Sequence, residues 1–118
     1  MRRNKNVKSK IKKASKNFLC LVTCPGLPMA RKMAKSILEK KLCACVNLIK
    51  GIESHYRWNG KLCKDSEILM IIKGNFRNQK ELARTIINLH SYEVPEIIFI
   101  QLDSGSSRYI DWINSNVA

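Results

Sequence analysis

The sequence predicts an α+β fold, and the pattern of apolar residues and turns indicates it. Four segments have the apolar character of strands, and two segments between them have apolar residues at helical spacing. Asn59-Gly60 joins two of the strand segments, and this dipeptide is a strong signal for a β-hairpin. The resulting order is strand, helix, strand, strand, helix, strand, followed by a short terminal helix. This order is typical of the ferredoxin-like (βαββαβ) sandwich.

The first elements lie before the hairpin turn. Phe18 to Cys24 is a predicted strand, and Pro25-Gly26 ends it. Residues 27–42 follow as an amphipathic helix, and the next strand spans about Ala44 to Trp58. The buried stripe of the helix is expected to contain Ala30, Ala34, Ile37, Leu38 and Leu42.

The later elements begin at the turn. A type I′ turn needs positive φ at both central residues, a conformation that Asn59 and Gly60 tolerate. The third strand continues to Lys73, and the spacing of Asn78 and Glu81 predicts a capping box at the start of a second helix. Its inner stripe is predicted at Leu82, Ala83, Ile86, Ile87 and His90, and a strand over 97–102, a loop over 104–107 and a helix over 108–116 follow.

Two strands are apolar at every position. Residues 68–72 and 97–100 have no polar alternation, whereas a strand with one face in water should alternate. Both faces of the sheet must therefore be covered. The chain has too few helices to cover both, so the pattern predicts that another copy of the protein covers the second face.

Charge divides the chain of 118 residues into two parts. Residues 1–17 contain eight Lys/Arg and no acid, whereas residues 18–118 contain fourteen Lys/Arg and nine Asp/Glu. We expect residues 1–17 to be a basic, flexible arm that contacts polyanions non-specifically, and residues 18–118 to be the folded domain. Val7, Ile11, Ala14 and Phe18 lie at helical spacing, so the arm could instead form a basic amphipathic helix on a partner.

The cysteines indicate a reducing compartment. No apolar run has the character of a signal peptide or a membrane span. Free thiols and a cytoplasmic location are therefore expected. The five cysteines, an odd number, are Cys20, Cys24, Cys43, Cys45 and Cys63.

Two segments resemble the motifs of the CutA divalent-cation tolerance proteins. They are Ala44-Cys45-Val46-Asn47 with Tyr56-Arg57-Trp58-Asn59-Gly60-Lys61, and His90-Ser91-Tyr92-Glu93-Val94-Pro95-Glu96. The resemblance covers residues 18–118 and implies a ferredoxin-like protomer in a homotrimer, with Tyr56, Trp58 and Lys61 on a hairpin between subunits. The chain departs from the motif at Ser91, where the family more often has Pro. Further matches are Gly51, Asp65-Ser66-Glu67, Lys73, Tyr109 and Trp112.

The same resemblance implies binding of a divalent metal ion, and copper is the expected ion with zinc as the alternative. His90, Glu93 and Glu96 form one candidate cluster, because imidazole and carboxylate groups together suit these ions. Cys45 is a further candidate, and with Cys43 it forms a pair of thiols on one strand face. Alternatively, His90 packs at a helix end, the glutamates are solvated or paired across the trimer, and the cysteines act as small hydrophobic residues.

No catalytic motif is present in the sequence. It has no Gly-rich phosphate loop, no H-E-x-x-H and no C-x-x-C, and His55 and His90 have no evident nucleophile beside them. The predicted function is therefore non-enzymatic cation binding in the response to metal ions. The alternative is a trimeric signalling or scaffold protein, similar to PII proteins, that binds a small effector or a protein partner. The cluster at residues 55–58 could serve either as a nucleotide-binding surface or as packing between subunits.

Overall fold

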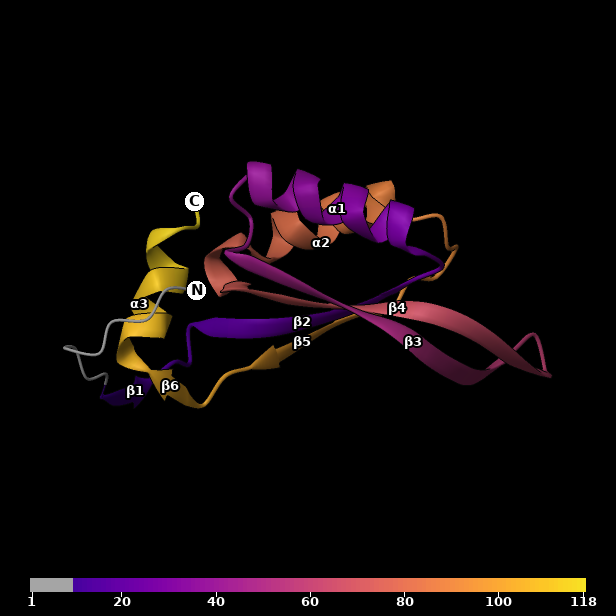
Figure 1. Ribbon diagram of the computed structural model, residues 1–118, viewed down its shortest axis with the longest axis horizontal. Coiled ribbons are helices and arrows are strands. Elements are labelled where there is room, and N and C mark those ends of the chain that lie inside the picture. Colours follow the sequence, from indigo (N-terminus) through magenta and orange to yellow (C-terminus); the bar gives the residue numbers. More distant parts are fainter. Residues whose placement is uncertain (1–9) are drawn as a thin grey trace.

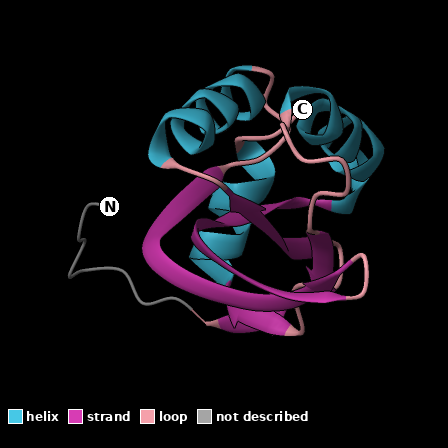
Figure 2. Cartoon of the chain, turned by 90° about the vertical axis from the view of Figure 1, so that its right-hand side faces the viewer, coloured by secondary structure: helices cyan, strands magenta, loops and turns pink. Residues whose placement is uncertain are grey.

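The computed structural model describes residues 10–118, which form two sheets and three α-helices (Figures 1 and 2). The larger sheet has the antiparallel strand order β3-β4-β2-β5, and the smaller one pairs β1 with β6. The predicted α+β fold is confirmed. Within residues 10–118 no helix combines the length and apolar character needed to cross a membrane. The elements are β1 (Ile11–Lys13), β2 (Asn17–Cys24), α1 (Leu27–Glu39), β3 (Cys45–Trp58), β4 (Lys61–Asn75), η1 (Phe76–Asn78), α2 (Gln79–Leu89), β5 (Ile97–Gln101), β6 (Ser104–Ser106) and α3 (Ser107–Ser115).

One face of the large sheet forms the hydrophobic core under α1 and α2, which lie side by side over it in Figure 1. Partner residues on neighbouring antiparallel strands point to the same face. Cys20 of β2 therefore shares the core face with Ile72 of β4 and Phe99 of β5. The helices bury Ala30, Met33 and Ile37 of α1, and Leu82, Thr85 and Ile86 of α2, against this face.

The other face of the sheet is apolar, and none of the helices within residues 10–118 lies over it (Figure 1). Leu21, Ile71 and Ile98 are register partners across three strands of this face. Leu21 and Ile71 are half-buried, whereas Ile98 is 48% exposed and Ile100 beside it is 44% exposed. The unbroken apolar pattern of β4 and β5 thus corresponds to one face in the core and one face that the described part of the chain leaves uncovered.

The β3–β4 hairpin is longer than the rest of the sheet and extends beyond the helices (Figure 1). Asn59 and Gly60 have φ values of 50° and 75°, so the predicted turn with two positive φ angles is confirmed. Gly51 also has positive φ, 76°, where the register shifts between Ile49 and Ile52. This bulge bends the hairpin just before the residues that line the main pocket.

Three details of the predicted helices are wrong. Leu38 of α1 and Ile87 of α2 were predicted to be buried, but they are 39% and 55% exposed. In α1 the buried residue is Met33, which the prediction did not include. Asn78 makes no capping hydrogen bond from its side chain. The η1 turn precedes α2, so the capping asparagine lies three residues earlier: the Asn75 side chain accepts a hydrogen bond from the Arg77 amide.

The described structure includes residues 10–17, which belong to the segment predicted to be a flexible arm. Residues 11–13 form β1, which pairs with β6 in the segment predicted to be a loop. Ala14 is buried against Ile110 and Ile113 of α3. Ile11 is exposed and lies in a short strand, and the buried Ala14 lies in the connection after it. Their helical spacing in the sequence therefore does not correspond to a helix in the structure. Residues 1–9 of the predicted arm lie outside the described residues.

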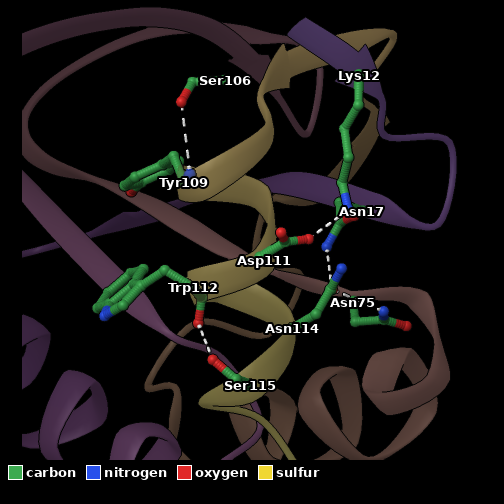
Figure 3. A network of polar contacts seen from close by, with 9 residues as sticks. All are labelled: Lys12, Asn17, Asn75, Ser106, Tyr109, Asp111, Trp112, Asn114 and Ser115. Atoms are coloured by element: carbon green, nitrogen blue, oxygen red, sulfur yellow. Dashed lines mark hydrogen bonds and ion pairs between the residues drawn. The ribbon is translucent and has the colours of Figure 1, made fainter. Parts of the chain in front are cut away.

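Side-chain amides attach α3 to the sheet (Figure 3). The Asn114 side-chain oxygen accepts hydrogen bonds from Asn17 Nδ2 at 2.7 Å and from Asn75 Nδ2 at 3.0 Å. Both donors are buried, so Asn114 satisfies polar groups that water does not reach. Lys12 and Asp111 pair at the surface of the same region.

Candidate cation site

A pocket of about 750 Å³ lies between the β3–β4 hairpin and the loop after α2. β2 contributes Thr23, the hairpin contributes residues 53–58 and Glu67, and the loop contributes Ser91 to Glu96. The bend at Gly51 and the exit of the chain from α2 bring these segments together. The lining residues are Thr23, Glu53, Ser54, His55, Tyr56, Trp58, Glu67, Ser91, Tyr92, Glu93, Val94 and Glu96.

Four carboxylates give the pocket its negative character: Glu53, Glu67, Glu93 and Glu96. Glu67 is the buried member, with 7% of its surface exposed, and it accepts a hydrogen bond from the Tyr92 hydroxyl at 2.8 Å. Burial, together with this hydrogen bond, raises the pKa of Tyr92. Tyr92 therefore remains a neutral donor that holds the Glu67 carboxylate at the pocket wall.

The hairpin side of the pocket carries polar pairs and aromatic rings. His55 Nε2 lies 2.9 Å from a Glu53 oxygen, and Lys64 lies 3.8 Å from the other oxygen of the same carboxylate. The Tyr56 hydroxyl donates to Asp65, and this hydrogen bond raises the pKa of Tyr56 to about 12. Trp58 lines the pocket with part of its ring exposed. Of the predicted hairpin residues, Tyr56 and Trp58 thus lie in the pocket, and Lys61 is exposed beside the turn.

His90 is turned away from the pocket and into the core. Its Nε2 lies 2.7 Å from the Thr23 carbonyl oxygen, and its Nδ1 accepts a hydrogen bond from the Tyr92 amide at 3.1 Å. These two contacts require a neutral ring with the proton on Nε2. Both nitrogens of His90 are therefore engaged within the chain.

The structure brings together two of the four predicted metal ligands. Glu93 and Glu96 line the pocket, whereas His90 packs behind it. Cys45 lies at the opposite end of β3, near Asn47, and Cys43 is buried. In the part of the chain that the structure describes, no three His, Cys, Asp or Glu side chains are grouped closely enough to hold a metal ion.

Glu53 and Glu67 are pocket residues that were not predicted as site residues. Glu67 directly precedes the apolar run of β4 and pairs in register with Ile52. The position of this acid directly before the apolar run Ile68–Ile72 is visible in the sequence, whereas its burial is a finding of the structure. Glu53 gives no such signal, because it lies on a hairpin where most residues are exposed.

Comparison with known proteins adds evidence that is independent of the geometry. The family model for the CutA1 divalent ion tolerance protein matches residues 18–116. The Divalent-cation tolerance protein CutA of Thermus thermophilus is 38% identical over 96 residues, which cover 81% of this chain and 93% of that protein. The chloroplastic Protein CutA of Arabidopsis thaliana is 39% identical over 100 residues, 85% of this chain. The matched region spans only 55% of the Arabidopsis protein and 52% of the mouse Protein CutA, which is 41% identical.

Solved structures agree with the sequence comparison. A divalent cation tolerance protein (Cut A1) from Thermus thermophilus superposes with a TM-score of 0.85 at 35% identity, and covers 86% of this chain and 99% of its own. CutA from Synechococcus elongatus gives a TM-score of 0.88 at 27% identity, with coverages of 93% and 97%. CutA1 from Oryza sativa gives 0.84 at 35% identity, with coverages of 86% and 94%.

Proposed function

This chain belongs to the CutA1 divalent ion tolerance family, and we propose that it binds a divalent cation, copper in the first place, in its acidic pocket as part of a homotrimer. The observation that carries this proposal is the convergence of Glu53, Glu67, Glu93 and Glu96 on one pocket. Carboxylate oxygens attract divalent cations, and His55 adds a nitrogen donor suited to copper or zinc. Zinc is the alternative ion.

The donors of the pocket support a site that needs more than one chain. No three His, Cys, Asp or Glu side chains within residues 10–118 are grouped closely enough to hold an ion. A site between subunits would complete the donor set with groups from a second copy. The β3-β4-β2-β5 strand order supports a ferredoxin-like protomer, and the apolar face with Ile98 and Ile100 supports its assembly through the sheets.

Copper binding can be followed from inside the pocket. The chain has two tryptophans, so Trp112→Phe leaves Trp58 as the single tryptophan reporter at the pocket wall. We expect Cu²⁺ to quench Trp58 fluorescence in a saturable way. Removing two carboxylates with Glu93→Gln and Glu96→Gln should weaken binding at least about tenfold, which corresponds to about 1.4 kcal/mol.

Three further variants define where the ion is bound. Glu39→Gln is the matched control, because Glu39 is an exposed acid on α1 that pairs with Lys35 and does not line the pocket, and binding should stay unchanged. His90→Ala and Cys45→Ser test the remaining ligands predicted from the sequence. If the glutamine variants bind Cu²⁺ as the parent does while Cys45→Ser does not, the ion is bound at the start of β3 and the pocket proposal is wrong.

A small organic effector is the second candidate ligand. The pocket is far larger than a bare ion, and Tyr56, Trp58 and Tyr92 give it three aromatic rings. These features support the PII-like signalling alternative. Saturable quenching of Trp58 by a cellular small-molecule fraction freed of metal by a chelator would favour this alternative.

Two further predictions extend the proposal. The family name describes tolerance of ions and not a reaction, which supports a non-enzymatic role. A cytoplasmic location stays a prediction; the five cysteines, all free in the structure, are compatible with a reducing compartment.

A further inference from the structure

The acidic pocket contains a buried carboxylate that has no cation beside it. Glu67 lines the pocket with 7% of its surface exposed, and it accepts a hydrogen bond from the neutral Tyr92 hydroxyl. Within residues 10–118, no Lys, Arg or His forms a salt bridge with Glu67, Glu93 or Glu96. Removing a carboxylate from water without a counter-charge costs free energy, so a buried acid is normally paired. Glu67 therefore points to a cationic ligand.

The composition of the pocket wall favours positive charge throughout. The sequence has 22 Lys/Arg and 9 Asp/Glu, with a formal net charge of +13, yet the wall contains four of the acids and no Lys or Arg. The local charge is thus opposite in sign to that of the whole chain. Such a pocket attracts cations and repels anions.

The acids are spread over the pocket and do not meet at one point. In the described residues 10–118, no group of three His, Cys, Asp or Glu side chains is close enough to hold a single ion. Glu67 is buried, whereas Glu53, Glu93 and Glu96 are exposed, so the negative charge extends from the interior of the pocket to its rim. A volume of about 750 Å³ is also in the range of sites for organic ligands. A ligand with several separated charges matches this arrangement better than a point charge.

Aromatic rings provide the surface between the charges. Tyr56, Trp58 and Tyr92 line the pocket, and Tyr56 and Trp58 are each 41% exposed. The face of such a ring attracts an ammonium group, and its apolar surface packs against methylene groups. The pocket therefore offers contacts for both parts of an alkylammonium chain.

We propose that the acidic pocket binds a linear aliphatic polyamine. One ammonium group pairs with Glu67 in the interior, and a second pairs with Glu93 or Glu96 at the rim, each through charge-assisted hydrogen bonds. The methylene chain between them lies against Tyr56 and Trp58. This inference rests on the cation-binding role proposed above for the same pocket, and it adds the chemical class of a ligand that needs no metal.

The test is a calorimetric titration of the full chain, freed of metal by dialysis against EDTA and then against buffer. The probes are the diamine putrescine and the triamine spermidine. We expect saturable binding of one molecule per chain, with spermidine bound more tightly because it has a third positive charge. Butanediol, the neutral analogue of putrescine, should not bind. Mg²⁺ has the charge of putrescine in one hydrated ion, and it should bind at least about tenfold more weakly.

Glu67→Gln is the decisive variant. Glutamine has nearly the same shape, and its side-chain oxygen can still accept the hydrogen bond from Tyr92, so mainly the charge is lost. Spermidine affinity should fall at least about tenfold. Glu81→Gln is the matched control, because Glu81 pairs with Arg84 on α2 and does not line the pocket. Its affinity should stay within about twofold, since exposed charges at a distance are screened.

Two further variants test the rim and the rings without changing the buried acid. Glu93→Gln removes an exposed carboxylate and should weaken spermidine binding about threefold. Trp58→Leu keeps an apolar wall but removes a ring face, and it should also weaken binding about threefold. Circular dichroism and light scattering check that each variant keeps the fold and the mass of the parent.

The outcomes separate this proposal from copper binding. It is overturned if spermidine gives no saturable heat, if Glu67→Gln and Glu81→Gln lose equal affinity, or if Mg²⁺ binds as tightly as putrescine. Quenching of Trp58 by Cu²⁺ without any spermidine binding would overturn the polyamine proposal alone. Spermidine binding without Cu²⁺ binding would support it and would overturn the copper proposal.

Discussion

Asn114 shows how one side chain joins distant parts of the chain. It accepts hydrogen bonds from Asn17 at the start of β2 and from Asn75 at the end of β4. Asn17 also donates to the Gly74 carbonyl, so its amide is fully engaged in the core. The terminal helix is therefore attached to the sheet by a polar network and by the apolar contacts of Ile110 and Ile113.

Asn114→Ala should lower the free energy of unfolding by about 1–3 kcal/mol, because it leaves two buried amide donors without an acceptor. Chemical denaturation monitored by circular dichroism measures the change. Asn116→Ala is the control, since the Asn116 side chain is exposed and donates to the Trp112 carbonyl within the same helix, and its effect should stay within about 0.5 kcal/mol. Equal losses in the two variants would show that the network contributes nothing beyond helix capping.

The hairpin turn is the clearest element that the sequence predicts correctly. Gly60 has a φ of 75°, and a Cβ added at this position would meet no other atom within 4 Å. Glycine is therefore favoured here by the positive φ and not by lack of space. Gly60→Ala should destabilise the turn by about 1–2 kcal/mol. Faster amide exchange at Trp58 and Leu62 would report it. Gly26→Ala is the matched control, because Gly26 has extended backbone and its added Cβ meets only Pro28 at 3.7 Å.

Local patterns could be predicted from the sequence, and long-range contacts could not. The strands and the Asn59-Gly60 turn depend on residue spacing within each segment. The pairing of β1 with β6 depends on a partner at the other end of the chain, so the basic segment gave no sign of a strand. The same reason applies to the candidate site. The motif places Glu93 and Glu96 close together in the sequence, and both line the pocket, but the direction of the His90 ring depends on its contact with the distant Thr23 carbonyl.

β1 provides a test of where the domain begins. Removing residues 1–16 eliminates the β1–β6 pairing and the buried contact of Ala14 with α3, so the melting temperature should fall. Removing residues 1–9 deletes Arg2, Arg3, Lys5 and Lys8 without touching any of these contacts, and it serves as the control. Differential scanning calorimetry compares the two. Identical melting temperatures would mean that β1 contributes no stability.

At the scale of the whole molecule, the uncovered sheet face is the dominant feature. Ile98→Lys places a charge among Leu21, Ile71 and their neighbours on this face. If copies assemble there, each buried Å² of apolar surface contributes about 25 cal/mol, and the lysine should break the trimer into monomers. Light scattering at low micromolar protein measures the mass.

Ile87→Lys is the matched control for this substitution. Ile87 is a similarly exposed isoleucine, but it lies on the outer side of α2. Its variant should keep the mass of the parent. A parent protein that is already a monodisperse monomer at this concentration would contradict the trimer proposal altogether.

The basic N-terminal segment gives a second prediction at this scale. Eight Lys/Arg within residues 1–17 should bind duplex DNA non-specifically, and five phosphate contacts would give a logarithmic salt slope of about −4.5. Removal of residues 1–9 halves this charge and should bring the slope closer to zero. Fluorescence anisotropy at several salt concentrations measures it. A slope near zero in the full chain would exclude polyanion binding by this segment.

The strand order also determines when the protein can fold. β2 lies inside the large sheet, yet one of its two neighbours, β5, ends only at Gln101. The partner of β1 is β6, which comes still later in the chain, at residues 104–106. A growing chain on the ribosome can close the β3–β4 hairpin early, but it cannot complete the sheet until nearly all residues have emerged. Such non-local pairing slows folding and leaves the apolar strands exposed in the meantime. The nascent chain should therefore depend on chaperones more than a helical protein of the same length.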